Sequence, residues 1–145
     1  MDVGLVAGTH ALQKPPEEDE KAVILLDTNA VIWLHDRHPR AATLERDGRP
    51  LYVSPATLLE LQVLTESGRL SLRRGATPQQ LLGDDRWAQD DPSAAAWFEA
   101  ALDIVWTRDV FDRLLVAHAR FRRWRFATAD ALILEHLAAH EILEL

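Results

Sequence analysis

Five acidic residues have neighbours and spacings that could bring their carboxylates together: Asp27, Glu60, Asp109, Asp112 and Asp130. Asp27 directly follows the apolar residues 23–26, and Asp130 closely follows the short segment 126–128. Carboxylates that lie close together cannot all stay ionised unless a cation joins them. Hard divalent cations such as Mg²⁺ take oxygen ligands, and two such ions can position a phosphodiester and activate water. The residue types therefore predict a carboxylate metal site, provided that the fold assembles them.

Each of these acids also has an ordinary structural explanation. The chain has 23 Asp and Glu residues in all, and acids near helix N-termini are favoured by the helix dipole in any protein. A single carboxylate at such a place indicates little. The argument for a site depends on the repetition of the pattern along the chain.

Alternating elements are predicted to position the acids. Residues 23–26 read as a buried strand, with Asp27 at its carboxyl end and Thr28 or Asn29 capping the helix that follows. Further strands are predicted at 51–53, 104–106, 126–128 and, as a last edge strand, 141–145. Helices are predicted from Pro55 to Gly68, at 77–82, at 91–101, after Asp109 and at 131–139, with loops at 37–50 and 83–90.

This order predicts an α/β fold with a central parallel sheet of four to five strands, flanked by helices on both faces (α/β/α). Glu60 lies inside the apolar pattern of the second helix, and Asp109 and Asp112 are three residues apart in the first turn of another. In such a sheet every strand-to-helix connection would deliver a carboxylate to the same edge. Ligands of open α/β sheets bind at that edge.

Length and composition indicate one domain, spanning residues 22–145, after a flexible acidic N-terminal tail at 1–21. The tail contains Pro15, Pro16 and the acidic run 17–20, and it shows no periodic pattern. The formal net charge of −7 argues against broad nonspecific binding to nucleic acid. The chain has no Cys, no signal-peptide pattern and no apolar run approaching a membrane span, so a cytoplasmic location with no membrane partner is expected.

Four motifs, in order, resemble those of a known family. They are Leu25-Leu26-Asp27-Thr28-Asn29, Ser54-Pro55-Ala56 leading to Glu60, Asp109-Val110-Phe111-Asp112-Arg113, and Ala127-Thr128-Ala129-Asp130. Together they resemble PIN domains, and more closely the VapC toxins of bacterial toxin–antitoxin pairs. The resemblance extends from about residue 23 to residue 145. It implies a Mg²⁺- or Mn²⁺-dependent endoribonuclease that hydrolyses RNA with metal-activated water and is blocked by a cognate antitoxin. A homodimer is also expected.

Roles carry over by position. Asp27, Glu60, Asp112 and Asp130 match the family's acidic quartet as metal and catalytic residues, with Glu60 acting directly or through water. The resemblance makes Asp109 an accessory metal acid and places Thr28 and Thr128 beside the metal as supporting hydroxyl residues. Two positions differ from the pattern: Asn29, another supporting residue, stands where many relatives have His, and Val110 replaces a frequent Pro.

Several basic and aromatic residues can have either a functional or a structural role. Arg113 is expected to pair with a carboxylate near the site and to contact RNA, and Arg123 to contact RNA from a group of arginines around Phe121 and Trp124. The alternative for that group is a cationic helix end that complements the helix dipole. His118 is expected to be a hydrogen-bonded core residue, and Trp33, Trp97 and Trp106 are expected in the core. His136 and His140 have metal-ligand spacing but no third ligand.

Other functions remain possible from the residues alone. A PIN-type nuclease for general RNA or DNA processing would need the same acids, and an inactive PIN-like binding module would not need all of them. A phosphatase of the haloacid-dehalogenase type would want Asp two residues after Asp27, where Asn29 stands. A receiver-type switch would want a later Lys, but Lys14 and Lys21 both precede Asp27. Nucleotide binding is disfavoured because no Gly-rich phosphate loop is present.

Overall fold

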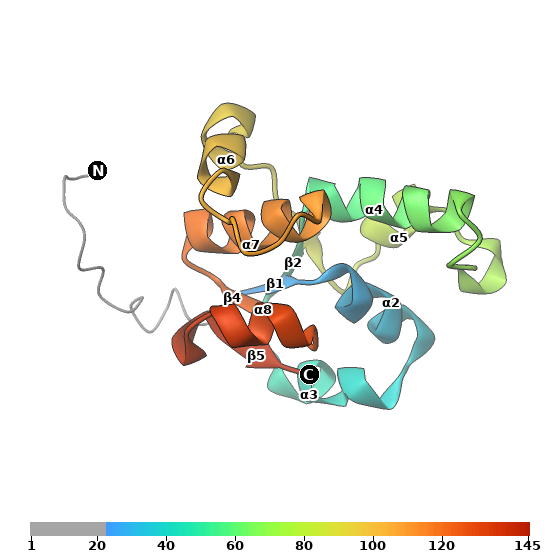
Figure 1. The fold of residues 1–145 in the computed structure, drawn as a ribbon. Helices are drawn as coiled ribbons and strands as arrows, with labels where there is room; N and C mark the ends of the chain where they lie inside the picture. The colour runs from blue at the N-terminus through green and yellow to red at the C-terminus, as the bar shows by residue number, and fades with distance from the viewer. Residues whose placement is uncertain (1–22) are drawn as a thin grey trace.

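The computed structural model describes residues 23–145 and shows a five-stranded, fully parallel sheet (Figure 1). The strands are β1 (Ile24–Leu26), β2 (Leu51–Val53), β3 (Ala88–Gln89), β4 (Arg125–Thr128) and β5 (Ile142–Glu144). Their order across the sheet is β3-β2-β1-β4-β5. In register, Leu25 lies between Tyr52 of β2 and Phe126 of β4. The α/β/α class and the strand number predicted from the sequence are confirmed. The predicted acidic tail lies outside the described residues.

Seven α-helices occur in the described part of the chain. They are α2 (Thr28–Asp36), α3 (Ala42–Asp47), α4 (Pro55–Glu66), α5 (Pro78–Leu82), α6 (Ala94–Ala101), α7 (Val110–Arg122) and α8 (Ala131–His136). Short 3₁₀ turns lie at Pro39–Ala41, Arg73–Gly75 and Ala139–Glu141. No helix within residues 23–145 has the length and apolarity that crossing a membrane requires.

The sheet separates two hydrophobic cores. Side chains of successive strand residues point to opposite faces, so Ile24 and Leu26 join one core while Leu25 joins the other. The first core includes residues of α2, α3, α4 and α5, and the second includes residues of α6, α7 and α8. All three residues of β1 are completely buried. The continuous apolar run in the sequence is therefore explained by a strand covered on both faces.

The predicted third strand is wrong. Ile104 and Val105 lie in turns after α6, where the N–H of Ile104 donates to the carbonyl of Ala101. Ile104 is buried in the second core, whereas Val105 is 70% exposed, so the apolar run reflects a turn that anchors one residue. The strand that takes its place in the sheet is β3, in the predicted loop 83–90. It is a two-residue, exposed edge strand, which a hydrophobic pattern cannot reveal.

Smaller differences concern helix boundaries. Helix α3 lies in the predicted loop 37–50, α6 begins at Ala94 rather than near Asp91, and α8 ends at His136 rather than near Ala139. Ser54 and Thr77 are the N-caps of α4 and α5, and their side chains accept hydrogen bonds from Ala56 N and Gln80 N. These boundary differences do not change which helix carries each of the five acids.

Candidate active site

The strand order places the ends of β1 and β4 at a topological switch point. The chain moves from β1 to β2 and β3 on one side of the sheet, and then crosses to β4 and β5 on the other. Asp27 follows β1 directly, and Asp130 follows β4 after one intervening residue. A crevice at the carboxyl ends of two such strands is where open α/β sheets bind ligands. These two acids therefore lie where the fold itself provides a site.

Asp27 is held by hydrogen bonds to both carboxylate oxygens. Its Oδ1 accepts from the backbone N–H of Thr28 at 2.7 Å, and its Oδ2 accepts from the hydroxyl of Thr128 at 2.7 Å. Asp27, rather than Thr28 or Asn29, is therefore the N-cap of α2. Its exposure is 7%. The pKa of Asp27 is raised to about 6. Burial is the largest cause, the two hydrogen bonds oppose it, and the charges of Asp130 and Asp109 add to it.

Glu60 reaches the same site from α4. The hydroxyl of Thr28 donates to its Oε1 at 2.6 Å, and Thr28 Oγ1 also lies 3.2 Å from Thr57 Oγ1. Burial raises the pKa of Glu60, and the nearby charge of Asp27 contributes in the same direction. Thr57 is completely buried and was not anticipated. Its spacing of three residues before Glu60, on the same side of a helix, was the available signal.

Asp109 and Asp112 enter the site from the start of α7. Asp109 is the N-cap of this helix, and its Oδ1 accepts from the N–H of Asp112 at 3.0 Å. The pKa of Asp112 is raised to about 7. Burial is the largest cause, the charge of Asp109 is the next, and the charges of Asp27, Asp130 and Glu60 add to them. Each of the other four acids therefore acts on Asp112. The two acids arrive from a turn after α6, not from the end of a strand as the sequence pattern suggested.

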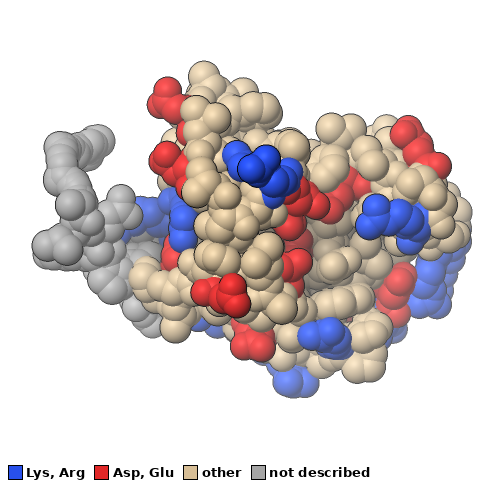
Figure 2. Space-filling view, viewed as in Figure 1, with Lys and Arg blue, Asp and Glu red and all other residues tan. Residues whose placement is uncertain are grey.

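Asp130 completes the acidic cluster, which we define as Asp27, Glu60, Asp109, Asp112 and Asp130. It is the N-cap of α8, and its Oδ1 accepts from the N–H groups of Leu132 and Ile133 at 2.9 and 3.1 Å. Thr128 links it to Asp27, because Thr128 Oγ1 also accepts from the N–H of Asp130 at 3.0 Å. Figure 2 shows acidic surface along the middle of the view, with basic groups on both flanks.

The donor set suits a hard divalent cation, although the side chains are not arranged around one. No three acidic or histidine side chains within residues 23–145 are grouped so that they could hold a metal ion as they stand. Three of the acids instead accept hydrogen bonds from the helices that they cap. The donors are all oxygen. Burial is the main cause of the raised pKa values of Asp27 and Asp112, the charges of neighbouring acids add to it, and a cation would offset both effects. The donor chemistry thus fits a hard divalent cation.

Three other residues predicted for the site lie at different distances from the acidic cluster. The side chain of Asn29 is exposed in the first turn of α2. Arg113 donates through Nε to the carbonyl of Thr107 at 2.8 Å, within the turn that precedes α7. Arg123 ends α7 in a left-handed conformation with φ 63°. Since it lies 11 residues after Asp112 in sequence, it is about 16 Å further along the helix, at the end away from the acidic cluster.

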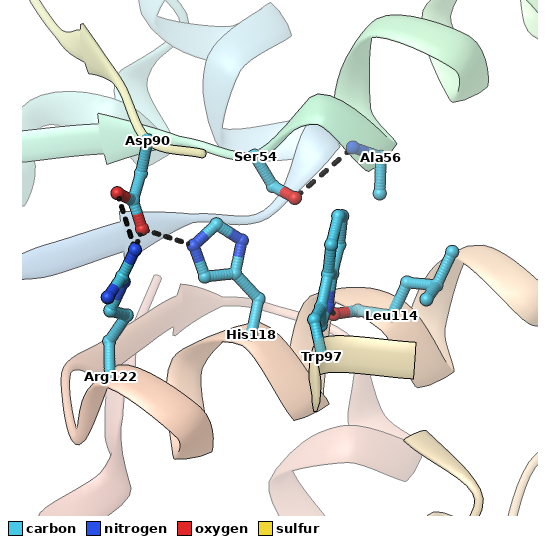
Figure 3. A network of polar contacts seen from close by, with 7 residues as sticks. All are labelled: Ser54, Ala56, Asp90, Trp97, Leu114, His118 and Arg122. Carbon is cyan, nitrogen blue, oxygen red and sulfur yellow. Dashed lines mark hydrogen bonds and ion pairs between the residues drawn. The ribbon is translucent and has the colours of Figure 1, made fainter. Parts of the chain in front are cut away.

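A second polar network joins α7 to the residue that follows β3 (Figure 3). His118 Nε2 and Arg122 Nε both lie 2.7 Å from Oδ2 of Asp90, which directly follows β3. His118 is completely buried, and burial lowers its pKa, as expected for a neutral core histidine. Figure 3 also shows Ser54, whose hydroxyl oxygen accepts from the N–H of Ala56 at 3.2 Å, whereas Nδ1 of His118 has no hydrogen-bond partner among the described residues. Ser54 and His118 are both 0% exposed, so a substrate does not reach them.

A comparison with protein-family models identifies the family of this chain. The family model described as PIN domain matches residues 24–140. The chain belongs to the PIN domain family. Its switch-point acids lie in the matched region. A comparison with curated proteins gave no match.

Solved structures with this fold include toxin–antitoxin proteins. A chain of VapBC2 from Rickettsia felis, crystallised with a DNA fragment from its promoter, is similar with a TM-score of 0.58 and 19% identity. The alignment covers 84% of this PIN domain chain and 97% of that one. A chain of a toxin–antitoxin complex from Klebsiella pneumoniae gives a TM-score of 0.58 at 17% identity, over 84% and 99% of the two chains. At these identities the likeness establishes the fold.

Proposed function

We propose that this PIN domain is a metal-dependent endoribonuclease and the toxin of a toxin–antitoxin pair. The observation that carries the nuclease assignment is the acidic cluster of a PIN fold. The charges of four acids act on Asp112, and two of these acids, Asp27 and Asp130, lie at the switch point. The toxin assignment is supported by the similar chains from toxin–antitoxin complexes and by the four sequence motifs. The nuclease assignment also gives a role to Thr128 and Thr28, which orient the carboxylates of Asp27 and Glu60.

Each residue has a role in the proposed reaction. Asp27, Asp112 and Asp130 would hold Mg²⁺ or Mn²⁺, with Glu60 completing the site directly or through water and Asp109 as an accessory acid. A bound ion of this kind supplies positive charge to the phosphate and makes water a better nucleophile. Thr128 fixes the Asp27 carboxylate, and Thr28 fixes that of Glu60.

Arginine side chains would supply the affinity for RNA that the net charge of −7 does not. Arg113 is near the cluster, since its guanidinium is bonded inside the turn that leads to Asp109 and Asp112. Its remaining N–H groups can reach a phosphate. Arg123, at the far end of α7, would contact only an RNA that extends beyond the cluster.

A cognate antitoxin is the expected protein partner. The acidic cluster is a charge excess that an arginine can neutralise in place of a metal, with bidentate bonds to a carboxylate. We propose that a segment of the antitoxin lies over the cluster and places an Arg against Asp27 or Asp112. In a complex with such a partner, Arg→Ala in that segment should restore RNA cleavage, and full inhibition by the altered antitoxin would contradict the proposal.

The proposed toxin would form a homodimer through exposed apolar residues. Leu59 and Val63 of α4 are 58% and 40% exposed, and Phe98 and Leu102 at α6 are 53% and 68% exposed. Both helices pack on α7. An interface between copies would cover exposed apolar side chains such as these. Sedimentation of wild type and Leu102→Glu would test it: a monomeric wild type contradicts the dimer.

The test of the enzymatic proposal compares wild type with Asp112→Asn. Cleavage of a structured RNA is followed with Mn²⁺ and with EDTA, and binding of the same RNA is followed by gel shift. We expect metal-dependent cleavage by wild type, and none by Asp112→Asn. RNA binding should persist or tighten, because the substitution removes a negative charge that faces phosphate. Glu99→Gln, an exposed acid on α6, is the matched control and should cleave like wild type. Cleavage by Asp112→Asn at the wild-type rate would disprove the central assignment, and cleavage of DNA in preference to RNA would favour a general nuclease.

A further inference from the structure

Two aromatic rings from separate parts of the chain stack against each other near the acidic cluster. Trp106 lies in the segment between α6 and α7, and His136 is the last residue of α8. Their ring centroids are 4.5 Å apart, and the ring planes differ by only 6°. Figure 1 shows α8 and the segment leading into α7 next to each other on the near side of the sheet. The sequence pattern placed Trp106 in the core, but it is only partly buried.

The stacked pair joins the two segments that carry acids of the cluster. Trp106 directly precedes Thr107, whose hydroxyl accepts from the N–H of Asp109 and whose carbonyl accepts from Arg113. His136 lies six residues after Asp130 in sequence, a rise of about 9 Å along the helix. A single-stranded RNA bound at the cluster would therefore pass within reach of the pair.

The imidazole ring of His136 is held in place. Its Nδ1 lies 2.9 Å from the carbonyl oxygen of Leu132, and since a carbonyl only accepts, Nδ1 carries the hydrogen in the neutral ring. This leaves Nε2 as an acceptor. The side chain of His136 remains 32% exposed. A ring fixed by a neighbouring ring and a hydrogen bond loses little further freedom when a third ring stacks on it.

The charge of the protein makes such a contact useful. With 16 Lys and Arg against 23 Asp and Glu, the chain has no general attraction for a polyanion. Stacking of a base on an aromatic side chain does not depend on charge and tolerates any base. We infer that Trp106 and His136 form a stacking platform for a nucleobase of single-stranded RNA beside the scissile phosphate. This inference rests on the proposed ribonuclease function.

The experiment measures binding and cleavage with His136→Ala, His136→Phe and a control, His140→Ala. Binding of a labelled single-stranded RNA is measured by fluorescence anisotropy in EDTA, alongside an oligonucleotide of the same length with abasic positions. Loss of the platform in His136→Ala should weaken RNA binding by about 5- to 150-fold. Binding of the abasic oligonucleotide should not change. With Mn²⁺, KM should rise by a similar factor and kcat should stay within about twofold, and His136→Phe should retain most of the affinity because a ring remains.

Three results would overturn the platform. His136→Ala could bind RNA as tightly as wild type, it could lose affinity equally for normal and abasic RNA, or His136→Phe could lose as much as His136→Ala. A melting curve of each variant identifies any loss that comes from unfolding. The test also separates this inference from the proposed function. If wild type cleaves RNA and His136→Ala behaves identically, only the platform fails, whereas a wild type without metal-dependent cleavage removes the proposed function and the platform with it.

Discussion

The hydroxyl of Thr128 donates a hydrogen bond of 2.7 Å to Oδ2 of Asp27, and it accepts one of 3.0 Å from the N–H of Asp130. One completely buried side chain thus connects the ends of β1 and β4 and two acids of the cluster. Because burial opposes ionisation of Asp27, this donor is one of the contacts that keep its pKa from rising further.

Thr128→Val should therefore destabilise the protein at neutral pH. Valine keeps the shape of threonine but removes the donor to a buried carboxylate, and a hydrogen bond to a charged group contributes about 1.5–3 kcal/mol. We expect a loss of that size in the free energy of unfolding, measured by urea denaturation at pH 7.5. Thr65→Val is the control, since Thr65 donates only to the carbonyl of Leu61 on α4, and it should cost less than about 1 kcal/mol. Equal losses for both variants would contradict a special role for Thr128.

Metal-free stability should fall as pH rises from 5 to 7. The ordinary pKa of Asp is 3.8, and the folded-state pKa is about 6 for Asp27 and about 7 for Asp112. Between these values the folded protein binds more protons than the unfolded chain, so stability is present at low pH and is lost as pH rises through the folded-state values. We expect a melting temperature in EDTA that is several degrees higher at pH 5 than at pH 7.5.

His118 has the opposite effect on the pH dependence of stability, so the measurement needs a control variant. Its pKa is lowered below 6.5 by burial, so the unfolded chain binds the extra proton and stability from this group falls as pH decreases below 6.5. Asp112→Asn leaves His118 in place and removes one raised pKa. Its melting temperature should therefore depend less steeply on pH than that of wild type. A flat or rising wild-type melting temperature from pH 5 to 7 would contradict the charge excess at the cluster.

Binding of Mn²⁺ should require the two acids at the switch point. Calorimetry at pH 7.5 should detect Mn²⁺ uptake by wild type and none by Asp27→Asn combined with Asp130→Asn. Uptake should release protons, because Asp112 and Asp27 have raised pKa values that the cation would lower. The proton release is measured by repeating the titration in buffers of different ionisation enthalpy. Unchanged uptake in the double variant would place the metal elsewhere.

The sequence predicted the positions of Asp27 and Asp130 after strands, but it did not predict every element that carries an acid. Asp27 and Asp130 were correctly placed, because each adjoins a buried strand whose apolar residues are contiguous. Asp109 and Asp112 were assigned to the end of a strand at 104–106, which is a turn. Their place in the cluster did not depend on that strand, since the start of α7 is fixed by Asp109 as its N-cap.

The parts that the sequence did not predict depend on contacts between distant residues. Strand β3 has two exposed residues and exists through its pairing with Tyr52 and Val53. The Thr57–Thr28 contact joins residues 29 positions apart, and the spacing of Thr57 and Glu60 indicates a shared helix face but not this contact. The orientation of the carboxylates toward helix N-termini, rather than toward a shared centre, is likewise a property of packing. A sequence can report that a carboxylate is available, whereas its direction is set by the donors around it.

Asp90 should contribute strongly to stability, although it lies outside the acidic cluster. Its carboxylate accepts from His118 at 2.7 Å and from both Nε and Nη2 of Arg122, which ties the end of β3 to the second half of α7. Asp90→Ala would leave the buried Nε2 of His118 without its partner, and a buried donor without an acceptor costs about 1–3 kcal/mol. Asp84→Ala is the matched control. It removes a comparable Asp–Arg pair, with Arg86, that is more exposed and should cost less than about 1 kcal/mol. Urea denaturation of the two variants at pH 7.5 measures the difference. Equal effects of the two substitutions would mean that the network with His118 adds nothing beyond a surface ion pair.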